Sequence, residues 1–241
     1  MAPVNVSNVV RKMDEVKKLV VADICNTLFD SNTTFDFVRY CVDTGRLKCN
    51  RLLYHALFSK ISPLFVGIAI LHKFTRTDIH KKMAVRLFKN KSTQDVRDWA
   101  TSFLKEYLQG REIHESLSYL HQYKPENIIL VSSTIYPVAE TIAAYLNIDH
   151  FIATELEIVN SKYTGRIKHE ISGSKLSALH EKYSPEKFEI EMVITDNFSD
   201  KELMDKSKKK LAVCYDNRQE KFWSALRDVN IIRIKNIPGH G

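Results

Sequence analysis

The sequence predicts an α/β fold, a doubly wound, Rossmann-like parallel sheet with an inserted helical segment and a β-hairpin. Three observations predict it. Short apolar runs rich in Ile, Val and Leu alternate with helical stretches, as in a parallel sheet covered on both faces. Residues 35–110 interrupt this alternation with a long stretch that contains no convincing strand. Residues 154–167 form alternating segments around Asn160-Ser161, which is a hairpin signal.

The strands are expected at the short apolar runs, because strands buried on both faces are apolar throughout rather than alternating. These runs stand at 19–22, 127–131, 190–195, 211–213 and 231–234. The main helices between them are expected over 112–123, 136–146, 175–183 and 217–226.

The inserted segment 35–110 is expected to be helical almost throughout. Thr33 or Thr34 could cap its first helix. Thr77 and Ser92 stand before later amphipathic runs, where they are expected to act as N-caps.

An apolar stretch at 61–71 lies within this segment. It is too short to span a bilayer as a helix, which takes roughly 20 apolar residues. It fits the buried core of a helical bundle. It also fits an interfacial segment, flanked by basic side chains, that contacts the surface of a bilayer.

Composition places the chain among ordinary globular proteins. Its 241 residues are 44% hydrophobic and 27% charged, enough for one α/β domain with an insertion. No Cys-x-x-Cys pair occurs, and no long apolar stretch follows the basic residues near the N-terminus. We therefore expect reduced thiols, no signal peptide and a cytoplasmic protein.

The net charge of +7 has two readings. It can be a solvated basic surface, or it can attract anions such as phosphorylated substrates or an anionic membrane face. The densest basic run, 206–210, stands between a helix and a strand, as expected for a helix end favoured by the dipole. No aromatic-interleaved basic stripe or nucleic-acid motif occurs, so we expect no nucleic-acid partner.

Asp23 carries the strongest chemical signal. It ends the apolar run 19–22 and is followed by a turn that contains Thr27. An ionised Asp is rarely buried unless it is paired or binds a metal ion. A carboxylate at the tip of a buried strand is therefore a candidate reactive group.

Three later segments could complete a site with Asp23. The strand at 127–131 ends in the hydroxyls of Ser132 and Ser133, and Lys175 opens a helix. The strand at 190–195 is followed by further polar candidates, Asp196, Asn197 and Asp200. Ligands of open α/β sheets bind outside the carboxyl ends of the strands. Together these groups predict a magnesium-dependent phosphoryl-transfer site.

These residues, in this order, closely resemble the motifs of the haloacid-dehalogenase-like (HAD) hydrolases, in particular the phosphoserine-phosphatase-like branch (subfamily IB). The resemblance covers roughly residues 17–215. It implies a core domain made of 1–34 and 111–241, and a helical cap domain at 35–110 that closes over the site. A lid of this kind excludes bulk water and completes a site.

The resemblance also implies a role for each candidate. Asp23 would be the nucleophile that forms an aspartyl-phosphate, and Lys175 would neutralise phosphate charge. Mg²⁺ would be bound by Asp23, by Asp196 and by the backbone carbonyl of Cys25. Asp200 would act through a coordinated water or steady Lys175. Candidate phosphate contacts are Thr27, Ser132, Ser133 and Asn197.

Cys25 departs from the family pattern, which usually has Asp two residues after the nucleophile. That Asp protonates the leaving oxygen and later activates water, help worth about 10²–10⁴-fold. A thiol is a weaker acid and hydrogen-bonds poorly. We therefore expect a phosphomonoester hydrolase, and a slow one to the extent that Cys25 fails to replace the usual Asp.

Two other functions stay open: a phosphoryl-binding regulatory or scaffold protein with little turnover, and a phosphotransferase to an acceptor other than water. The substrate could be a sugar phosphate, a phosphoamino acid or a lipid head group, with peripheral contact to an anionic membrane in the last case. The sequence does not indicate the oligomeric state.

Overall fold

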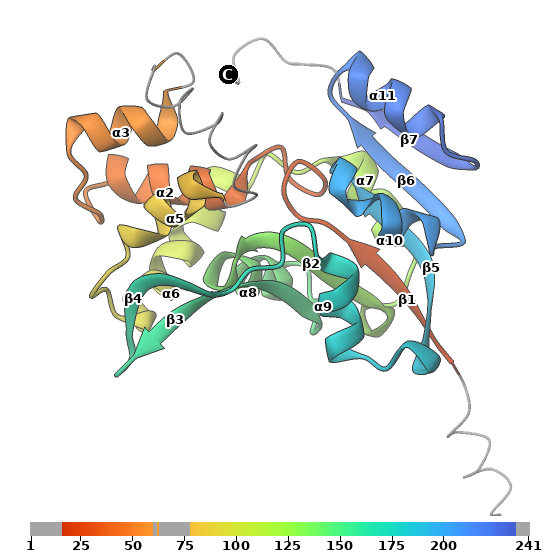
Figure 1. The fold of residues 1–241 in the computed structure, drawn as a ribbon, viewed down its shortest axis with the longest axis horizontal. Helices are drawn as coiled ribbons and strands as arrows, with labels where there is room; N and C mark the ends of the chain where they lie inside the picture. Colours follow the sequence, from red (N-terminus) through yellow and green to blue (C-terminus); the bar gives the residue numbers. More distant parts are fainter. Residues whose placement is uncertain (1–15, 60–61, 63–77, 235–241) are drawn as a thin grey trace, which may run out of the picture.

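The computed structural model describes residues 16–59, 62 and 78–234, and contains one mixed, mostly parallel sheet (Figure 1). The sheet has seven strands in the order β4-β3-β2-β1-β5-β6-β7. Their bounds are β1 Lys17–Ala22, β2 Ile128–Ile135, β3 Phe151–Val159, β4 Lys162–His169, β5 Phe188–Thr195, β6 Lys209–Cys214 and β7 Val229–Arg233. The predicted α/β fold with a parallel, doubly wound sheet is confirmed.

The β3–β4 hairpin is the antiparallel edge of the sheet. Asn160 and Ser161 connect its strands with positive φ angles of 50° and 58°, as in a two-residue type I′ turn. The other pairings, from β3 across to β7, are parallel. The predicted hairpin is thus present and longer than the sequence pattern indicates.

Helices fill the connections. Their bounds are α2 Thr33–Asp43, α3 Arg51–Phe58, α5 Ile79–Arg86, α6 Thr93–Phe103, α7 His114–Leu120, α8 Tyr136–Tyr145, α9 Lys175–Lys182, α10 Lys201–Asp205 and α11 Asn217–Ser224, with a π-helical turn at Leu104–Leu108 after α6. The helical character expected of 35–110 holds for its described residues. The apolar stretch 61–71 and Thr77 lie outside the described residues, residue 62 excepted. No helix in the described ranges is both long and apolar enough to cross a membrane.

The predicted helix caps are partly right. The hydroxyl of Ser92 accepts a hydrogen bond from the amide of Asp95, so Ser92 caps α6 as predicted. The prediction for α2 is wrong, because its N-cap residue is Asn32 and makes no side-chain cap bond. Thr33 and Thr34 are the first two helical residues, and their hydroxyls instead point at Thr134 at the end of β2.

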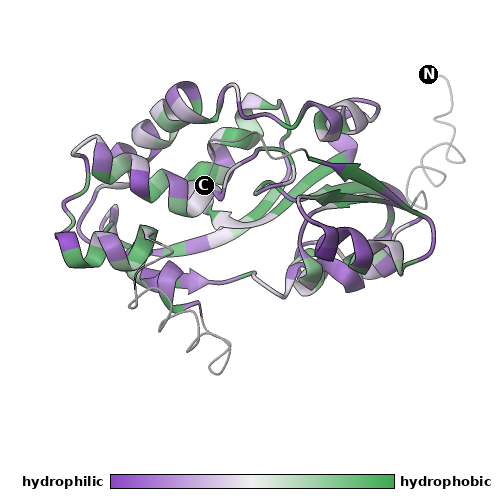
Figure 2. Ribbon diagram, turned by 90° about the horizontal axis from the view of Figure 1, so that it is seen from above, coloured by the Kyte–Doolittle hydropathy of each residue, from purple (hydrophilic) through white to green (hydrophobic). Residues whose placement is uncertain are grey.

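The central strands of the sheet are buried on both faces, which explains their apolar runs. Alternate residues of β1 belong to two different hydrophobic clusters, with Val20 in one and Val21 in the other. The first cluster contains residues of α2, α5, α6, α7 and α8, and the second contains residues of α9, α10 and α11. Figure 2 shows the central strands as predominantly hydrophobic between helices of mixed polarity.

The described helices of the predicted cap domain contribute residues to the first hydrophobic cluster, which also contains residues of the sheet. Phe37 of α2 packs on Phe88 and on Phe103, with ring centroids 5.7 and 5.4 Å away. Phe88 in turn contacts Tyr163 of β4. These rings join 33–103 to the hairpin side of the sheet, where Figure 1 shows α2, α3, α5 and α6 gathered.

The hairpin also approaches the chain just after α5. The amide of Asn90 donates to the carbonyl of Tyr163 at 2.8 Å, and the amide of Tyr163 donates to the carbonyl of Lys91 at 2.9 Å. Gly165, at a φ of +81°, faces this turn, and a Cβ there would stand 3.0 Å from Cβ of Lys89. A larger residue at 165 would push the helical segment away from the sheet.

Candidate active site

The strand register gathers the predicted site residues at one edge of the sheet. Ala22 of β1 is level with Leu130 of β2 and with Ile194 of β5. The residues that follow these three positions therefore lie side by side at the carboxyl edge of the central strands. In this way Asp23 comes close to Ser132 and Asp196, although more than a hundred residues separate it from either.

A tight turn follows Asp23. The amides of Thr27, Leu28 and Phe29 all donate to the carbonyl of Ile24, at 3.0–3.3 Å. Asn26 allows this curl because it adopts a positive φ of 50°, which Asn tolerates better than most residues. The Asp23 carboxylate accepts the amide of Ile24 at 2.7 Å, which fixes its orientation.

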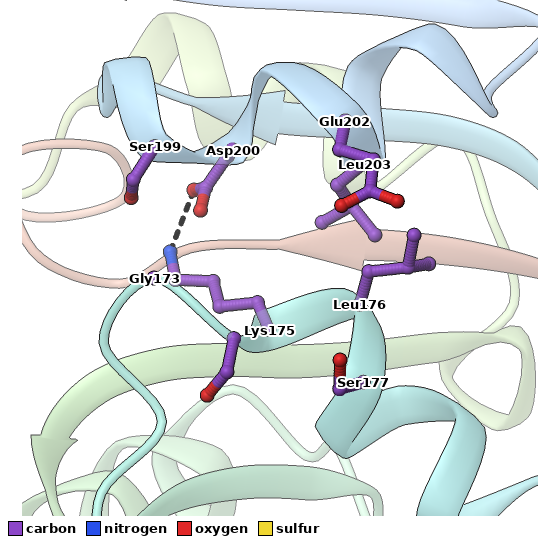
Figure 3. A pocket seen from close by; sticks show the side chains of 9 residues that line it. Gly173, Lys175, Leu176, Ser177, Ser199, Asp200, Glu202 and Leu203 are labelled. Atoms are coloured by element: carbon purple, nitrogen blue, oxygen red, sulfur yellow. Dashed lines mark hydrogen bonds and ion pairs between the residues drawn. The ribbon is translucent and has the colours of Figure 1, made fainter.

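Lys175 forms the centre of the site. Its ammonium lies 2.6 Å from Oδ2 of Asp23 and 2.7 Å from Oδ2 of Asp200. All three side chains are at most 5% exposed. Figure 3 shows Lys175 reaching from the start of α9 toward Asp200. Because a cation at a helix N-terminus opposes the helix dipole, this position does not serve the stability of α9.

The site carries more negative than positive charge. Asp196 stands beside the other two carboxylates, so three acids share one ammonium. Burial, and then the charge of Asp23, raises the pKa of Asp196 to about 7, although Lys175 opposes this. Burial also raises the pKa of Asp200 despite the opposing charge of Lys175. Burial alone would lower the pKa of Lys175, but the charges of Asp23 and Asp200 outweigh it and raise that pKa.

Thr27 fastens the turn after Asp23 to Asp196. Its hydroxyl donates to Oδ1 of Asp196 at 3.1 Å and accepts the Asp196 amide at 3.0 Å. Asn197 uses its side-chain oxygen to accept the amide of Ser199, which caps the short 3₁₀ turn Phe198–Asp200. In this structure the side chains of Thr27 and Asn197 therefore make hydrogen bonds that hold the backbone around Asp196 in place.

The donor set fits a hard divalent cation. Oδ1 of Asp200 is buried and has no hydrogen-bond partner among the described residues, and the pKa of Asp196 is raised by burial and then by the charge of Asp23. Oxygen ligands and uncompensated carboxylates are what Mg²⁺ binds. The described residues contain no group of three His, Cys, Asp or Glu side chains able to hold a metal ion. The predicted site needs two carboxylates and one backbone carbonyl, and it stays a prediction.

Cys25 belongs to a network of hydroxyl groups. Its sulfur lies 2.9 Å from Oγ1 of Thr33 and 3.8 Å from Oγ of Ser132, which donates to it. Thr33 continues the network by donating to Thr134 at 2.7 Å. Burial, and then the charge of Asp23, raises the pKa of the Cys25 thiol, although the bonds with Thr33 and Ser132 oppose this. The thiol is therefore neutral near pH 7.

The two serines in the second half of β2 differ in their surroundings. Ser132 is buried and faces Cys25 through its hydroxyl. Ser133 contributes its carbonyl, which accepts a hydrogen bond from the ammonium of Lys81 at 2.5 Å. No sequence pattern indicates a role for Lys81, because a Lys within a helical pattern is ordinarily an exposed residue.

A small cavity lies behind Lys175 and Asp200, between the start of α9 and α10 (Figure 3). Its volume of about 30 Å³ is that of about one water molecule. It is therefore too small for a phosphorylated substrate.

Comparison with solved structures shows a widespread fold. A protein of unknown function from Bordetella pertussis Tohama I is 16% identical, with a TM-score of 0.69 over 90% of this chain and 99% of that one. A phosphoserine phosphohydrolase-like protein from Francisella tularensis subsp. tularensis SCHU S4 is 18% identical, with a TM-score of 0.53 over 88% and 94% of the two chains. A phosphoserine phosphatase in its apo form is 16% identical, with a TM-score of 0.52 over 90% and 93%.

These likenesses confirm the fold that the resemblance to the phosphoserine-phosphatase-like branch predicts. No curated protein matches the chain significantly. The family model described as haloacid dehalogenase-like hydrolase matches residues 20–205, which include the four predicted motifs. The chain therefore belongs to the haloacid dehalogenase-like hydrolase family.

Proposed function

We propose that this hydrolase is a magnesium-dependent phosphomonoester hydrolase that acts through an aspartyl-phosphate on Asp23. The observation that carries the proposal is the buried ammonium of Lys175, held between Asp23 and Asp200 at 2.6 and 2.7 Å. It forms an ion pair with the proposed nucleophilic carboxylate and places a positive charge where a phosphate would bind.

In the first step, an oxygen of Asp23 attacks phosphorus in line. A new P–O bond to Asp23 forms while the P–O bond to the leaving group breaks. Lys175 neutralises charge on the phosphoryl oxygens, and the hydroxyl of Ser132 donates to one of them. The leaving oxygen takes up a proton from a nearby donor or from water.

In the second step, water attacks phosphorus and the P–O bond to Asp23 breaks, which releases phosphate. This step needs a base for the proton of water. Cys25 serves poorly as that base, because its neutral thiol is hydrogen-bonded to Thr33 and its pKa is raised. We therefore infer slow hydrolysis, fastest on substrates whose leaving group needs little protonation.

Mg²⁺ would be bound by the carboxylates of Asp23 and Asp196 and by the backbone carbonyl of Cys25, with Asp200 beside it. When bound, it supplies positive charge to the transferring phosphoryl group. The substitution at Cys25 leaves a backbone carbonyl in place, because every residue type has one.

The same observation on Cys25 supports a second candidate, a phosphoryl-binding regulatory protein with little turnover. A site that forms the aspartyl-phosphate and hydrolyses it slowly could also pass the group to an acceptor other than water. We further propose that the substrate is a small phosphorylated metabolite or a lipid head group. The protein is proposed to be cytoplasmic and to contact an anionic membrane peripherally.

A panel of phosphomonoesters tests the proposal, assayed with Mg²⁺ and with anionic or neutral liposomes. Phosphate release that chelator abolishes and Asp23→Asn removes would support hydrolysis. A phosphorylated acceptor would indicate transfer, and binding without turnover would indicate the regulatory role. Beryllium fluoride bound at a residue other than Asp23 would overturn the assignment of the nucleophile.

A further inference from the structure

A second buried lysine, Lys81 of α5, lies at the edge of the site. It is 3% exposed. Its ammonium contacts the carbonyl of Ser133 at 2.5 Å, Oγ1 of Thr154 at 2.8 Å and Oε1 of Glu170 at 2.8 Å. These three partners come from β2, from β3 and from the residue directly after β4. One side chain of the helical segment thus joins three parts of the sheet domain.

The contact between Lys81 and the Ser133 carbonyl lies one peptide unit away from Ser132, a candidate phosphate contact. The pairing of β2 with β3 is irregular between Ser132 and Ile135, which releases the Ser133 carbonyl from the regular ladder. Lys81 binds that carbonyl. The N–H of the same peptide unit belongs to Thr134 and donates to Oγ of Ser132 at 3.4 Å. The hydroxyl of Thr154 also donates to the Ser133 carbonyl, at 3.0 Å. Lys81, together with Thr154, therefore holds the peptide whose N–H donates to the Ser132 hydroxyl.

The contact with Glu170 reaches Lys175. Oε1 of Glu170 also accepts the amides of Ile171 and Ser172, both at 3.0 Å, and so holds the start of the loop that leads to Lys175. Burial alone would raise the pKa of Glu170, but the charge of Lys81 and the hydrogen bonds from Lys81, Ser172 and Thr154 lower it, so the carboxylate is ionised. Ile171 is fully buried, and its carbonyl accepts the amide of Ser174 directly before Lys175.

We propose that Lys81 is a positioning residue: from α5 it holds the Ser133 peptide and Glu170, and thereby sets both Ser132 and the loop of Lys175. Its role in catalysis rests on the proposed function. Lys81 itself touches no reacting atom. It makes the geometry of the site depend on the seating of a helix that belongs to the predicted cap.

The test compares Lys81→Met with Lys82→Met. Lys82 is the next residue of α5, is exposed and has no side-chain partner among the described residues, so it is a matched control. Lys81→Met should lower kcat by roughly 10- to 100-fold, because misplacement by about 1 Å costs on that order. KM should change less than about threefold, Lys81→Arg should restore part of kcat, and Lys82→Met should match the wild type.

Two further variants keep the proposal testable if Lys81→Met does not fold. Glu170→Gln keeps an acceptor for both amides but removes the charge that Lys81 pairs with, and it should lower kcat in the same direction. Lys81→Met combined with Glu170→Gln leaves no unpaired buried charge. If the variants that fold keep the wild-type kcat and KM and lose only thermal stability, then Lys81 is merely structural and the proposal is wrong.

Amide exchange measured by NMR separates this proposal from the proposed function. Lys81→Met should speed exchange at Ile171 and Ser172 by at least about tenfold, while the amides of β5 and β6 stay protected. This readout needs no turnover. An inactive wild type would therefore refute the hydrolase, whereas unchanged exchange at these two amides would refute the positioning role of Lys81.

Discussion

Lys175 and Lys81, the buried lysines in the described part of the chain, are alike in burial and differ in charge balance. The ammonium of Lys175 forms ion pairs with the carboxylates of Asp23 and Asp200, and the carboxylate of Asp196 lies nearby. Lys81 has one carboxylate, Glu170, and its other two partners are a carbonyl and a hydroxyl. Around Lys81 the charges cancel, whereas around Lys175 a negative surplus is left.

This difference indicates what each lysine is for. Around Lys81 the carboxylate is ionised, as its lowered pKa shows, and no further charge is needed. Around Lys175 burial raises the pKa of both Asp196 and Asp200, which is a cost to the folded state. A protein keeps such a surplus where a ligand relieves it. The comparison therefore supports both proposals made above: ligand binding at the Lys175 centre, and positioning of neighbouring groups by Lys81.

The largest effect is expected at the Lys175 centre. Asp23→Asn removes the nucleophile and should lower kcat at least about 10⁴-fold, as loss of a covalent catalyst does. Unfolding followed by circular dichroism serves as the control, because Asn is nearly isosteric and the fold should persist. Full turnover by this variant would show that Asp23 does not form the intermediate.

A gain is expected at Cys25. Cys25→Asp should raise kcat on alkyl phosphates by up to about 10²-fold, within the range of general acid–base catalysis. Thr33 and Ser132 already hydrogen-bond the side chain at this position and could bind a carboxylate. The gain should shrink on aryl phosphates, whose oxygens leave without protonation. A folded variant that binds Mg²⁺ but is no faster on either class would show that Cys25 is not the bottleneck.

The buried carboxylate of Asp196 predicts how the free energy of unfolding of the metal-free protein depends on pH. The pKa of Asp196 rises from 3.8 to about 7 on folding, so metal-free protein should lose stability as pH increases from about 4 to 7. Asp196→Asn removes this loss. It should stabilise metal-free protein by roughly 1–4 kcal/mol above pH 7 and by almost nothing at pH 4.

Urea unfolding at several pH values, with and without Mg²⁺, measures this effect. Mg²⁺ should stabilise the wild type more at pH 8 than at pH 5, and chelator should reverse the gain. If Asp196→Asn is instead destabilising at pH 8 without metal, the carboxylates carry no surplus and the contrast between the two lysines disappears.

The smallest effect is expected at an exposed ion pair. Lys201 and Asp205 form an i,i+4 contact at 2.7 Å with both side chains about half exposed. Lys201→Met should leave kcat unchanged and shift Tm by less than about 2 °C, because exposed pairs contribute little. A larger shift, measured by thermal unfolding, would show that distance rather than burial sets the strength of these pairs.

The sequence was sufficient for the framework of the fold. Continuous apolar runs located β1, β2, β5, β6 and β7, because strands covered on both faces show no polar alternation, and an alternating pattern located the β3–β4 hairpin. The common edge of a parallel sheet then predicted that Asp23, Ser132 and Asp196 lie together, as they do. Their chemical roles stay predictions.

The remaining features depend on contacts between distant residues. Lys81 meets its partners across 52, 73 and 89 positions of sequence, and no local pattern indicates such contacts. The prediction that Thr33 or Thr34 caps α2 is wrong for the same reason. Local rules treat a Thr at a helix start as a cap, whereas here the hydroxyls are committed to Thr134, a hundred residues away.

The hydrophobic cluster shared by the helical segment and the sheet has a consequence for cooperativity. Val20, Phe37, Phe103 and Leu130 belong to one cluster, although they come from both sides of the predicted domain boundaries. Heating should therefore give a single calorimetric transition, with equal van't Hoff and calorimetric enthalpies. In recombination between relatives, the helical insertion would have to be exchanged together with the sheet face that it covers.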